Sequence, residues 1–191
     1  MQTTLTNITA RGKNTSSQHH LFLRLTSRLI RYGQKLGPVQ GVGYINELIA
    51  RLTGKQVKDE TQTNRTLDSS PATFPLDRTI YADFSHDDQM VAIYSAVGLF
   101  QQKDSLPTTS DDPNRTWRVS RMVPFAGRMV TEKLKCSRGD FVRVFVGDAL
   151  QPLDFCGADS SGLCSLDDFV KSQSYARENG KGDFQKCFSK K

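Results

Sequence analysis

The clearest pattern along the chain is a stripe of apolar residues that begins just after Gly37-Pro38. Its members, at spacings of three and four, are Val42, Ile45, Leu48, Ile49 and Leu52. Such spacings place side chains on one face of an α-helix. We therefore predict a helix that runs to about Thr53 and ends at Gly54.

A second region joins an extended segment directly to a helix. Residues 55–75 are polar and contain two prolines, which predicts a loop. Residues 76–84 predict a strand, of which 79–84 leads straight into the next element. A helix should follow from an N-cap at Ser85 to about Phe100. Its apolar face would consist of Met90, Ile93, Tyr94 and Val97.

The last third of the chain alternates in the manner of strands. After a polar surface loop over 101–116, the strand-like pattern starts at Trp117. Residues 128–136 and 141–146 predict a hairpin around a turn at 137–140, and a third strand should follow near 150–153. Ser165 and Asp168 resemble a capping box, which predicts a helix from there to about 177.

This order of elements indicates an α/β or α+β domain. It contains too few parallel strands for a doubly wound sheet, and we find no internal repeat. Residues 1–35 differ in character from the rest, because they are polar up to His20 and carry only a short apolar, basic stretch at 21–30. We predict a disordered or weakly helical extension. His19-His20 lacks a third ligand nearby, so a solvated pair is favoured over a metal site.

Composition and charge narrow the function classes. A chain of 191 residues with 37% apolar residues suits one domain with a modest core. Its net charge of +6 is concentrated near the two ends and is not interleaved with aromatic residues. That distribution favours a solvated basic surface over a nucleic-acid groove. The sequence contains no run of about 18 apolar residues, so it predicts no membrane-spanning helix. Residues 1–7 show no secretory signal.

The four cysteines all lie in the last third of the chain, without a CxxC pair. This argues against zinc. The Gly- and Ser-rich loop from Cys156 to Cys164 has the form that a local disulfide needs. Four Asn-x-Ser/Thr sequons occur, at Asn7, Asn14, Asn64 and Asn114. Sequons together with a disulfide-like loop favour a secreted parent protein.

The candidate chemistry lies in 81–87, where the predicted strand delivers His86 and Asp87 to a helix N-terminus. Free N–H groups and the positive end of a helix dipole favour a phosphate there. His86 adds a cation or hydrogen-bond donor, and Asp87 adds a possible general acid. The alternative is an ordinary N-terminal cap without chemistry.

Several separate stretches carry a family resemblance. In chain order they are 36–44, 46–53, 67–76, 81–87, 123–126, 142–153 and the loop from Cys156 to Cys164. In this order they resemble the fungal phytases of the histidine acid phosphatase family, over about residues 36–188. The resemblance is to the C-terminal part of such an enzyme. It implies an incomplete α/β histidine phosphatase (phosphoglycerate mutase-like) fold with a central strand, flanking helices and an antiparallel meander. Residues 1–35 would be a non-matching extension, and 36–191 would be the C-terminal part of the phosphatase domain.

The resemblance also implies roles for particular residues. Asp87 would protonate the leaving alcohol of a phosphomonoester such as phytate, and His86 would hold the phosphate oxygens. Cys156 would pair with Cys164, whereas Cys136 and Cys187 would each pair with a cysteine outside this sequence. Asn64 and Asn114 would be glycosylation candidates on a secreted enzyme. No cofactor, metal, nucleic acid or membrane partner is implied, and the oligomeric state is not fixed.

Two departures from the family pattern matter. Asp88 stands where these phytases usually have Asn, and a second carboxylate would repel phosphate. The family's nucleophilic histidine lies in an Arg-His-Gly-x-Arg-x-Pro motif, which this sequence does not contain. Tyr32 occupies the corresponding place in a chance likeness at 31–38. We therefore predict that the chain alone is inactive. The alternatives are a non-catalytic inositol-phosphate-binding or basic interaction protein and, more remotely, a nucleic-acid-binding protein.

Overall fold

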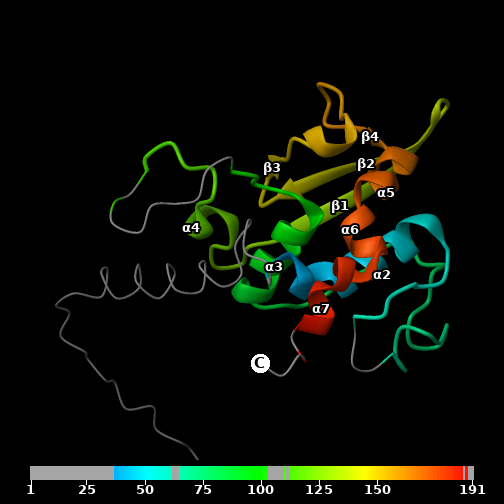
Figure 1. Cartoon of the computed structure of the whole chain (residues 1–191). Helices are drawn as coiled ribbons and strands as arrows, with labels where there is room; N and C mark the ends of the chain where they lie inside the picture. Colours follow the sequence, from blue (N-terminus) through cyan, green and yellow to red (C-terminus); the bar gives the residue numbers. More distant parts are fainter. Residues whose placement is uncertain (1–36, 62–64, 103–109, 111, 187, 189–191) are drawn as a thin grey trace, which may run out of the picture.

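The structure is a computed structural model that describes residues 37–61, 65–102, 110, 112–186 and 188 (Figure 1). Several predictions fall outside these residues. They are the character of 1–35, the histidine pair His19-His20, the sequons at Asn7, Asn14 and Asn64, and the thiol of Cys187.

The first predicted helix is confirmed. A short 3-10 helix, η1 (Pro38–Gly41), leads into α2 (Val42–Thr53). The apolar stripe of α2 lies inward, and Val42 and Ile45 are completely buried. Gly54 ends the helix in a left-handed conformation at φ 69°, with its N–H donating to the carbonyl of Ala50 at 2.8 Å.

Residues 55–86 form no helix and no strand among the described positions, so the predicted strand over 76–84 is wrong. The segment is extended, but a strand also needs a neighbouring backbone to pair with. No described segment runs beside it with ladder hydrogen bonds. Two of its apolar side chains are left in solvent, with Ile80 83% and Phe84 99% exposed.

The helix after this segment, α3 (Asp87–Val97), is close to the prediction at both ends. It begins with His86 rather than Ser85 as its N-cap residue, and His86 makes no side-chain cap hydrogen bond. It ends before Phe100 because Gly98 adopts φ 93°, a conformation that glycine takes without strain. Its inward face includes Tyr94, which is fully buried.

A close approach of backbones sets the distance between η1 and α3. A Cβ atom added to Gly41 would lie 2.6 Å from the carbonyl oxygen of Ala92 and 2.6 Å from the Cβ of Ala96. Real Cβ atoms do not approach other atoms so closely. Only glycine therefore permits this packing.

The strand-like pattern predicted from Trp117 begins later. Residues 119–122 form a single helical turn, α4 (Val119–Met122), in which the Met122 N–H donates to the Arg118 carbonyl at 3.1 Å. Trp117 and Met122 are both buried, at 3% and 1% exposure. A turn of four residues is too short to reveal its period in the sequence.

The predicted hairpin is confirmed. β1 (Met129–Cys136) pairs antiparallel with β2 (Gly139–Val146), in register from Met129 opposite Val146 to Cys136 opposite Gly139. The third strand is shorter than predicted, because β3 (Ala149–Leu150) has two residues. β3 and β4 (Cys164–Ser165) pair antiparallel with the other side of β2. The described sheet is thus an antiparallel meander with β1 at its edge.

The final predicted helix is confirmed, with a break at Gln173. α5 (Leu166–Ser172) and α6 (Ser174–Arg177) lie either side of this residue. The Ser165 hydroxyl caps α5 by accepting from the Asp168 N–H at 3.1 Å. Shorter turns complete the chain: η2 (Asp154–Cys156) before the cysteine loop, then η3 (Asn179–Gly182) and α7 (Asp183–Lys186) near the end.

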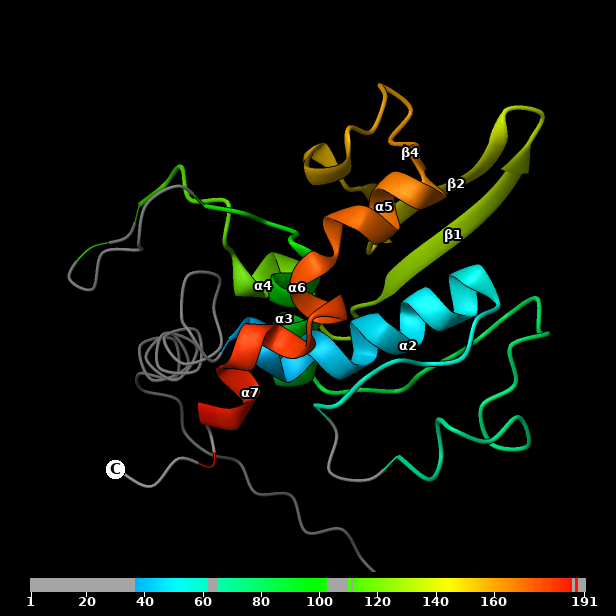
Figure 2. The same cartoon turned by 45° about the vertical axis from the view of Figure 1, so that its right-hand side comes forward.

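The helices and the meander share one core. α5 contacts β2 and β4, and α6 contacts α2, so the two helices run from the sheet down to the helical layer (Figure 2). Core side chains from all of these elements touch one another, among them Ile45, Tyr94, Val142, Leu153 and Phe169. Among the described residues, no helix combines the length and apolar character needed to cross a membrane.

Candidate functional site

The structure places His86 and Asp87 together at the start of α3. His86 is extended, at φ −111° and ψ 163°, and Asp87 is the first helical residue. Both side chains are exposed. The pair therefore lies open to solvent at the positive end of an 11-residue helix, as the sequence predicts.

The first-turn N–H groups are occupied by local carboxylates. The Asp88 N–H donates to Oδ1 of Asp87 at 3.0 Å, and the Gln89 N–H donates to Oδ1 of Asp88 at 2.8 Å. These bonds fix how the two carboxylates lie against the helix end. An incoming phosphate would compete with Asp87 for the Asp88 N–H and with Asp88 for the Gln89 N–H, so Asp88 opposes a phosphate by competition as well as by its charge.

The segment leading to the site is fastened to α2 by Arg51. Its NH1 and NH2 groups donate to the two carboxylate oxygens of Asp83 at 2.5 and 3.0 Å. The same guanidinium lies 4.8 Å from the ring centroid of Phe74 and 5.1 Å from that of Tyr81. A bidentate ion pair and two cation–π contacts thus hold residues 74–83 in place, three residues before His86.

Tyr44 lies beneath this ion pair on α2. Burial raises the pKa of its phenol to about 12, and the negative charge of Asp83 contributes in the same direction. The phenol is therefore protonated at neutral and acid pH. It cannot serve as a general base.

The segment just before the pair is open to solvent. Phe84, two residues before His86, is 99% exposed. Within the described part of the chain, no hydrogen bond or ion pair joins the His86 ring to another side chain. The arrangement brings a carboxyl group, an imidazole ring and a favourable helix end together, with no nucleophilic histidine beside them among the described residues.

No group of three or more His, Cys, Asp or Glu side chains that could hold a metal occurs in the described part of the chain. Cys156 and Cys164 form a disulfide with their Cα atoms 6.1 Å apart. Cys136, at the end of β1, has a free and exposed thiol. Asn114 is exposed, and its N–H donates to Oδ1 of Asp112 at 2.8 Å.

Two features were not found from the sequence. The Arg51–Asp83 contact joins residues 32 positions apart, which no local pattern reveals. A pocket of about 400 Å³ gathers arginines from 115–121 with apolar residues from distant segments. The only signal for the pocket was the spacing of three between Arg115, Arg118 and Arg121.

Comparison with known proteins now decides the family. Residues 9–147 match the Histidine phosphatase superfamily (branch 2), which is well over half of the chain. The chain belongs to this superfamily. The match starts at residue 9, whereas the quoted stretches of family resemblance start at about residue 36.

Fungal members of the superfamily are close in sequence. Phytase A of Aspergillus terreus is 48% identical over 161 residues, which cover 82% of this chain and 34% of that protein. Phytase A of Aspergillus oryzae is 43% identical over 175 residues, which cover 88% and 37%. The resemblance to fungal phytases is therefore confirmed, and the chain spans little more than a third of these relatives.

A solved structure supports the histidine phosphatase fold. The phytase from D. castellii superposes with a TM-score of 0.61 at 19% identity, over 78% of this chain and 29% of that one. At this identity the likeness concerns the fold alone. The fold class is confirmed, with flanking helices and an antiparallel meander in place. The expected central strand is not formed among the described residues.

Proposed function

We propose that this chain carries the proton-donating half of a phytase-like phosphomonoesterase site. Asp87 is the general acid, and His86 holds the phosphate oxygens. The observation that supports this proposal most directly is the exposed His86-Asp87 pair at the N-terminus of α3, in a chain close in sequence to proteins named Phytase A. Phytate, or another phosphomonoester, is the substrate class that fits this parentage.

The chemistry suits the two residue types. Cleaving a phosphomonoester leaves an alkoxide, which is a poor leaving group unless it gains a proton as the bond breaks. A protonated Asp87 beside the leaving oxygen supplies that proton and lowers the barrier. His86 and the positive end of α3 stabilise charge on the phosphoryl oxygens.

The nucleophile is not among the residues of this chain. The sequence has three histidines, at 19, 20 and 86, and none is followed by Gly. A phosphohistidine intermediate of the family type therefore has no residue to form on. We propose that the chain has no phosphatase activity alone, and that a complete site needs a segment with the Arg-His-Gly-x-Arg-x-Pro motif.

The remaining properties follow from the same parentage. We propose that the parent enzyme is secreted, needs no cofactor and carries glycans at Asn64 and Asn114. Cys136 and Cys187 would each be bridged to a cysteine outside this sequence. The free, exposed thiol of Cys136 is compatible with such a bridge.

A chimera tests the proposal. The N-terminal portion of Aspergillus terreus Phytase A is fused before residue 36 of this chain, and hydrolysis of phytate and of p-nitrophenyl phosphate is measured at acid pH. Asp87→Asn should lower kcat by about 10²–10⁴-fold, the usual contribution of a general acid. His86→Ala should chiefly raise KM. Asp88→Asn, the matched control, should retain activity and bind phosphate more tightly.

The unfused chain supplies the decisive comparison. It should be inactive toward both substrates at every pH. Turnover by the unfused chain that Asp87→Asn abolishes would contradict the requirement for an external nucleophile. A chimera whose kcat is unaffected by Asp87→Asn would contradict the role of Asp87.

The second candidate, a non-catalytic inositol-phosphate-binding protein, is favoured by the exposure of His86 at the same helix end. His86 could hold a phosphate without any chemistry, provided that the phosphate displaces the Asp87 and Asp88 carboxylates from the first-turn N–H groups. This candidate predicts that the unfused chain is monodisperse and binds phytate saturably. It also predicts that the chimera with the Phytase A N-terminal portion does not hydrolyse phytate. An aggregated chain that fails to bind phytate would count against it.

A further inference from the structure

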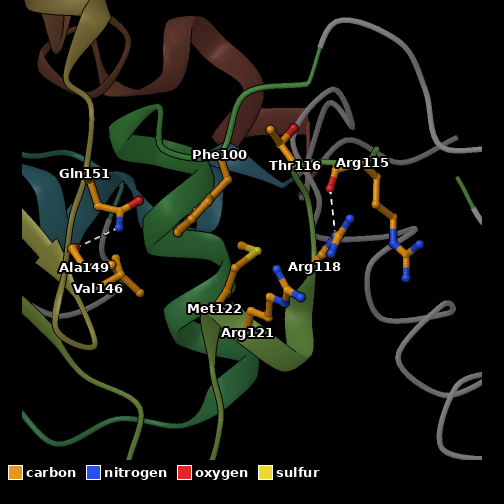
Figure 3. Close-up of a pocket in the computed structure, with 9 residues that line it drawn as sticks. All are labelled: Phe100, Arg115, Thr116, Arg118, Arg121, Met122, Val146, Ala149 and Gln151. Atoms are coloured by element: carbon orange, nitrogen blue, oxygen red, sulfur yellow. Dashed lines mark hydrogen bonds between the residues drawn. The ribbon is translucent and has the colours of Figure 1, made fainter. Parts of the chain in front are cut away.

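A pocket without an assigned role lies at the far end of α3 from His86 and Asp87. It has a volume of about 400 Å³ and is lined by Phe100, Arg115, Thr116, Arg118, Arg121, Met122, Val146, Ala149 and Gln151 (Figure 3). Phe100 follows the C-terminal end of α3, whereas His86 caps its N-terminal end. An 11-residue helix is about 16 Å long, so the pocket is separate from the proposed site.

Three arginines supply positive charge to this pocket. Figure 3 shows the Arg121 side chain lying between Met122 and Arg118, while Arg115 extends outward from the rim. Arg118 is held by backbone carbonyls, since its Nε donates to the Arg115 oxygen at 3.0 Å and its NH2 donates to the Pro113 oxygen. Such bonds orient the guanidinium without neutralising it.

Among the residues that the structure describes, no carboxylate balances these charges. None of the ion pairs among the described residues involves Arg115, Arg118 or Arg121. By contrast, Arg51, Arg128 and Arg143 each face an Asp or Glu partner. Unpaired guanidinium groups at the edge of a concavity are suited to bind phosphate or carboxylate oxygens from outside the chain.

The floor of the pocket is apolar. Phe100 follows the end of α3, Val146 ends β2, and Met122 belongs to α4. Tyr94 lies against the Phe100 ring at 5.6 Å, which fixes that ring from behind. A ligand that places an anionic group on the arginines would therefore bury a hydrocarbon portion against Phe100, Met122 and Val146.

We propose that this pocket binds a small organic anion with an apolar body, such as an alkyl phosphate ester. The anionic head lies against Arg118 and Arg121, and the hydrocarbon part lies on the Phe100 side. The specificity differs from that of the His86-Asp87 site, for which a fully polar inositol phosphate suffices. The inference does not depend on the proposed function.

Trp117 provides a local reporter. It is the single tryptophan of the sequence, is 3% exposed, and lies between the pocket residues Thr116 and Arg118. The experiment titrates the purified full chain with n-hexyl phosphate, inorganic phosphate and inositol hexakisphosphate, and follows tryptophan fluorescence. Hexyl phosphate should give a saturable change and bind at least about tenfold more tightly than inorganic phosphate, because burial of each CH₂ is favourable.

Variants locate the binding. Arg121→Gln should weaken hexyl phosphate about tenfold or more, since a charge-assisted hydrogen bond is lost, and Arg121→Lys should weaken it less. The matched control Arg138→Gln removes the same charge from the exposed hairpin turn and should change nothing. Asp87→Asn should also leave this titration unchanged, which keeps the result independent of the phosphatase proposal. Denaturation curves of each variant show that the fold persists.

Several results would overturn the proposal. They are the lack of a saturable change, equal affinity for hexyl and inorganic phosphate, and equal weakening by Arg121→Gln and Arg138→Gln. Tighter binding of inositol hexakisphosphate than of hexyl phosphate at this reporter would also overturn it, because a fully polar polyanion gains nothing from the apolar floor.

Discussion

Residues 129–177 and residues 65–86 differ in how they are held, although both contain well-spaced apolar side chains. In the first region Val142 and Phe169 are completely buried, and β2 is hydrogen bonded on both sides. In the second region Ile80 and Phe84 are 83% and 99% exposed, and the backbone has no ladder partner within the described chain. Burial stabilises the first region, whereas polar contacts position the second.

The difference has a physical origin. A strand becomes stable only when a neighbour satisfies its N–H and C=O groups and a layer covers its face. The meander provides both conditions within 50 residues of chain, with α5 contacting β2. The extended segment before His86 has instead the ion pair between Arg51 and Asp83. A segment held in this way is well positioned but contributes little to the stability of the domain.

Removal of a core aromatic from the first region should have the largest effect. Phe169→Ala should lower the free energy of unfolding by about 3–5 kcal/mol, because a buried ring leaves a cavity. The matched change Phe84→Ala in the second region should stay within about 0.5 kcal/mol, since that ring is already in water. Urea denaturation measures both. Similar losses for the two variants would mean that Phe84 is covered in solution.

Loss of the disulfide should have the next largest effect. The double variant Cys156→Ser/Cys164→Ser should cost about 2–3 kcal/mol, because the unfolded chain regains the entropy of a short loop. Cys136→Ser should be nearly neutral, since this thiol is exposed and unpaired in the described structure. Thermal unfolding with and without a reductant checks the result. A reductant that leaves the wild-type melting temperature unchanged would exclude a contribution from the bridge.

Release of the second region from α2 should have a smaller, local effect. Arg51→Ala removes the bidentate pair with Asp83 and both ring contacts, which should lower the free energy of unfolding by about 1–2 kcal/mol. Arg51→Lys keeps the charge but loses the forked guanidinium, so its loss of stability should lie between those of wild type and Arg51→Ala. Limited proteolysis should cut residues 76–84 faster in Arg51→Ala, while cleavage within 129–177 stays slow. Equal cleavage rates in the two variants would show that another contact holds the segment.

The helix cap of the first region should have the smallest effect. Ser165→Ala should destabilise by about 1 kcal/mol, the usual worth of an N-cap. The hydrogen bond from the Ser165 hydroxyl holds the pKa of the exposed Asp168 below its ordinary value, and the hydrogen bond and positive charge of Lys171 act in the same direction. A carboxyl group whose pKa is depressed in the folded state stabilises the protein fully above its unfolded pKa of about 4. This stabilisation is lost as the pH falls through the folded pKa. The gap between wild type and Ser165→Ala in urea titrations should therefore narrow in acid. A gap that stays constant with pH would rule out the link to Asp168.

Elements set by local patterns could be predicted from the sequence. α2, α3 and the β1–β2 hairpin follow from periodicity and from glycines at their ends, because those signals act over a few residues. The strand over 76–84 could not be settled in that way, since its existence depends on a partner elsewhere. α4 was missed because one turn shows no period.

The candidate site divides along the same line. The adjacency of His86 and Asp87 at a helix start was visible in the sequence, since it is a property of neighbouring residues. The Arg51 contact, the exposure of Phe84 and the composition of the arginine pocket were not visible. These features arise from packing between segments that lie tens of residues apart.

Gly41 influences the position of Asp87 although the two residues lie on different elements, η1 and α3. The hydrogen atom at this glycine permits η1 to rest directly on the Ala92–Ala96 face of α3. α3 is one rigid rod, and Asp87 stands on its first turn. A methyl group at residue 41 would push α3 away from η1. The N-terminal turn of α3, which carries Asp87, would then shift relative to the segment that Arg51 holds. The position of the Asp87 carboxylate thus depends on a glycine that lies outside the proposed site.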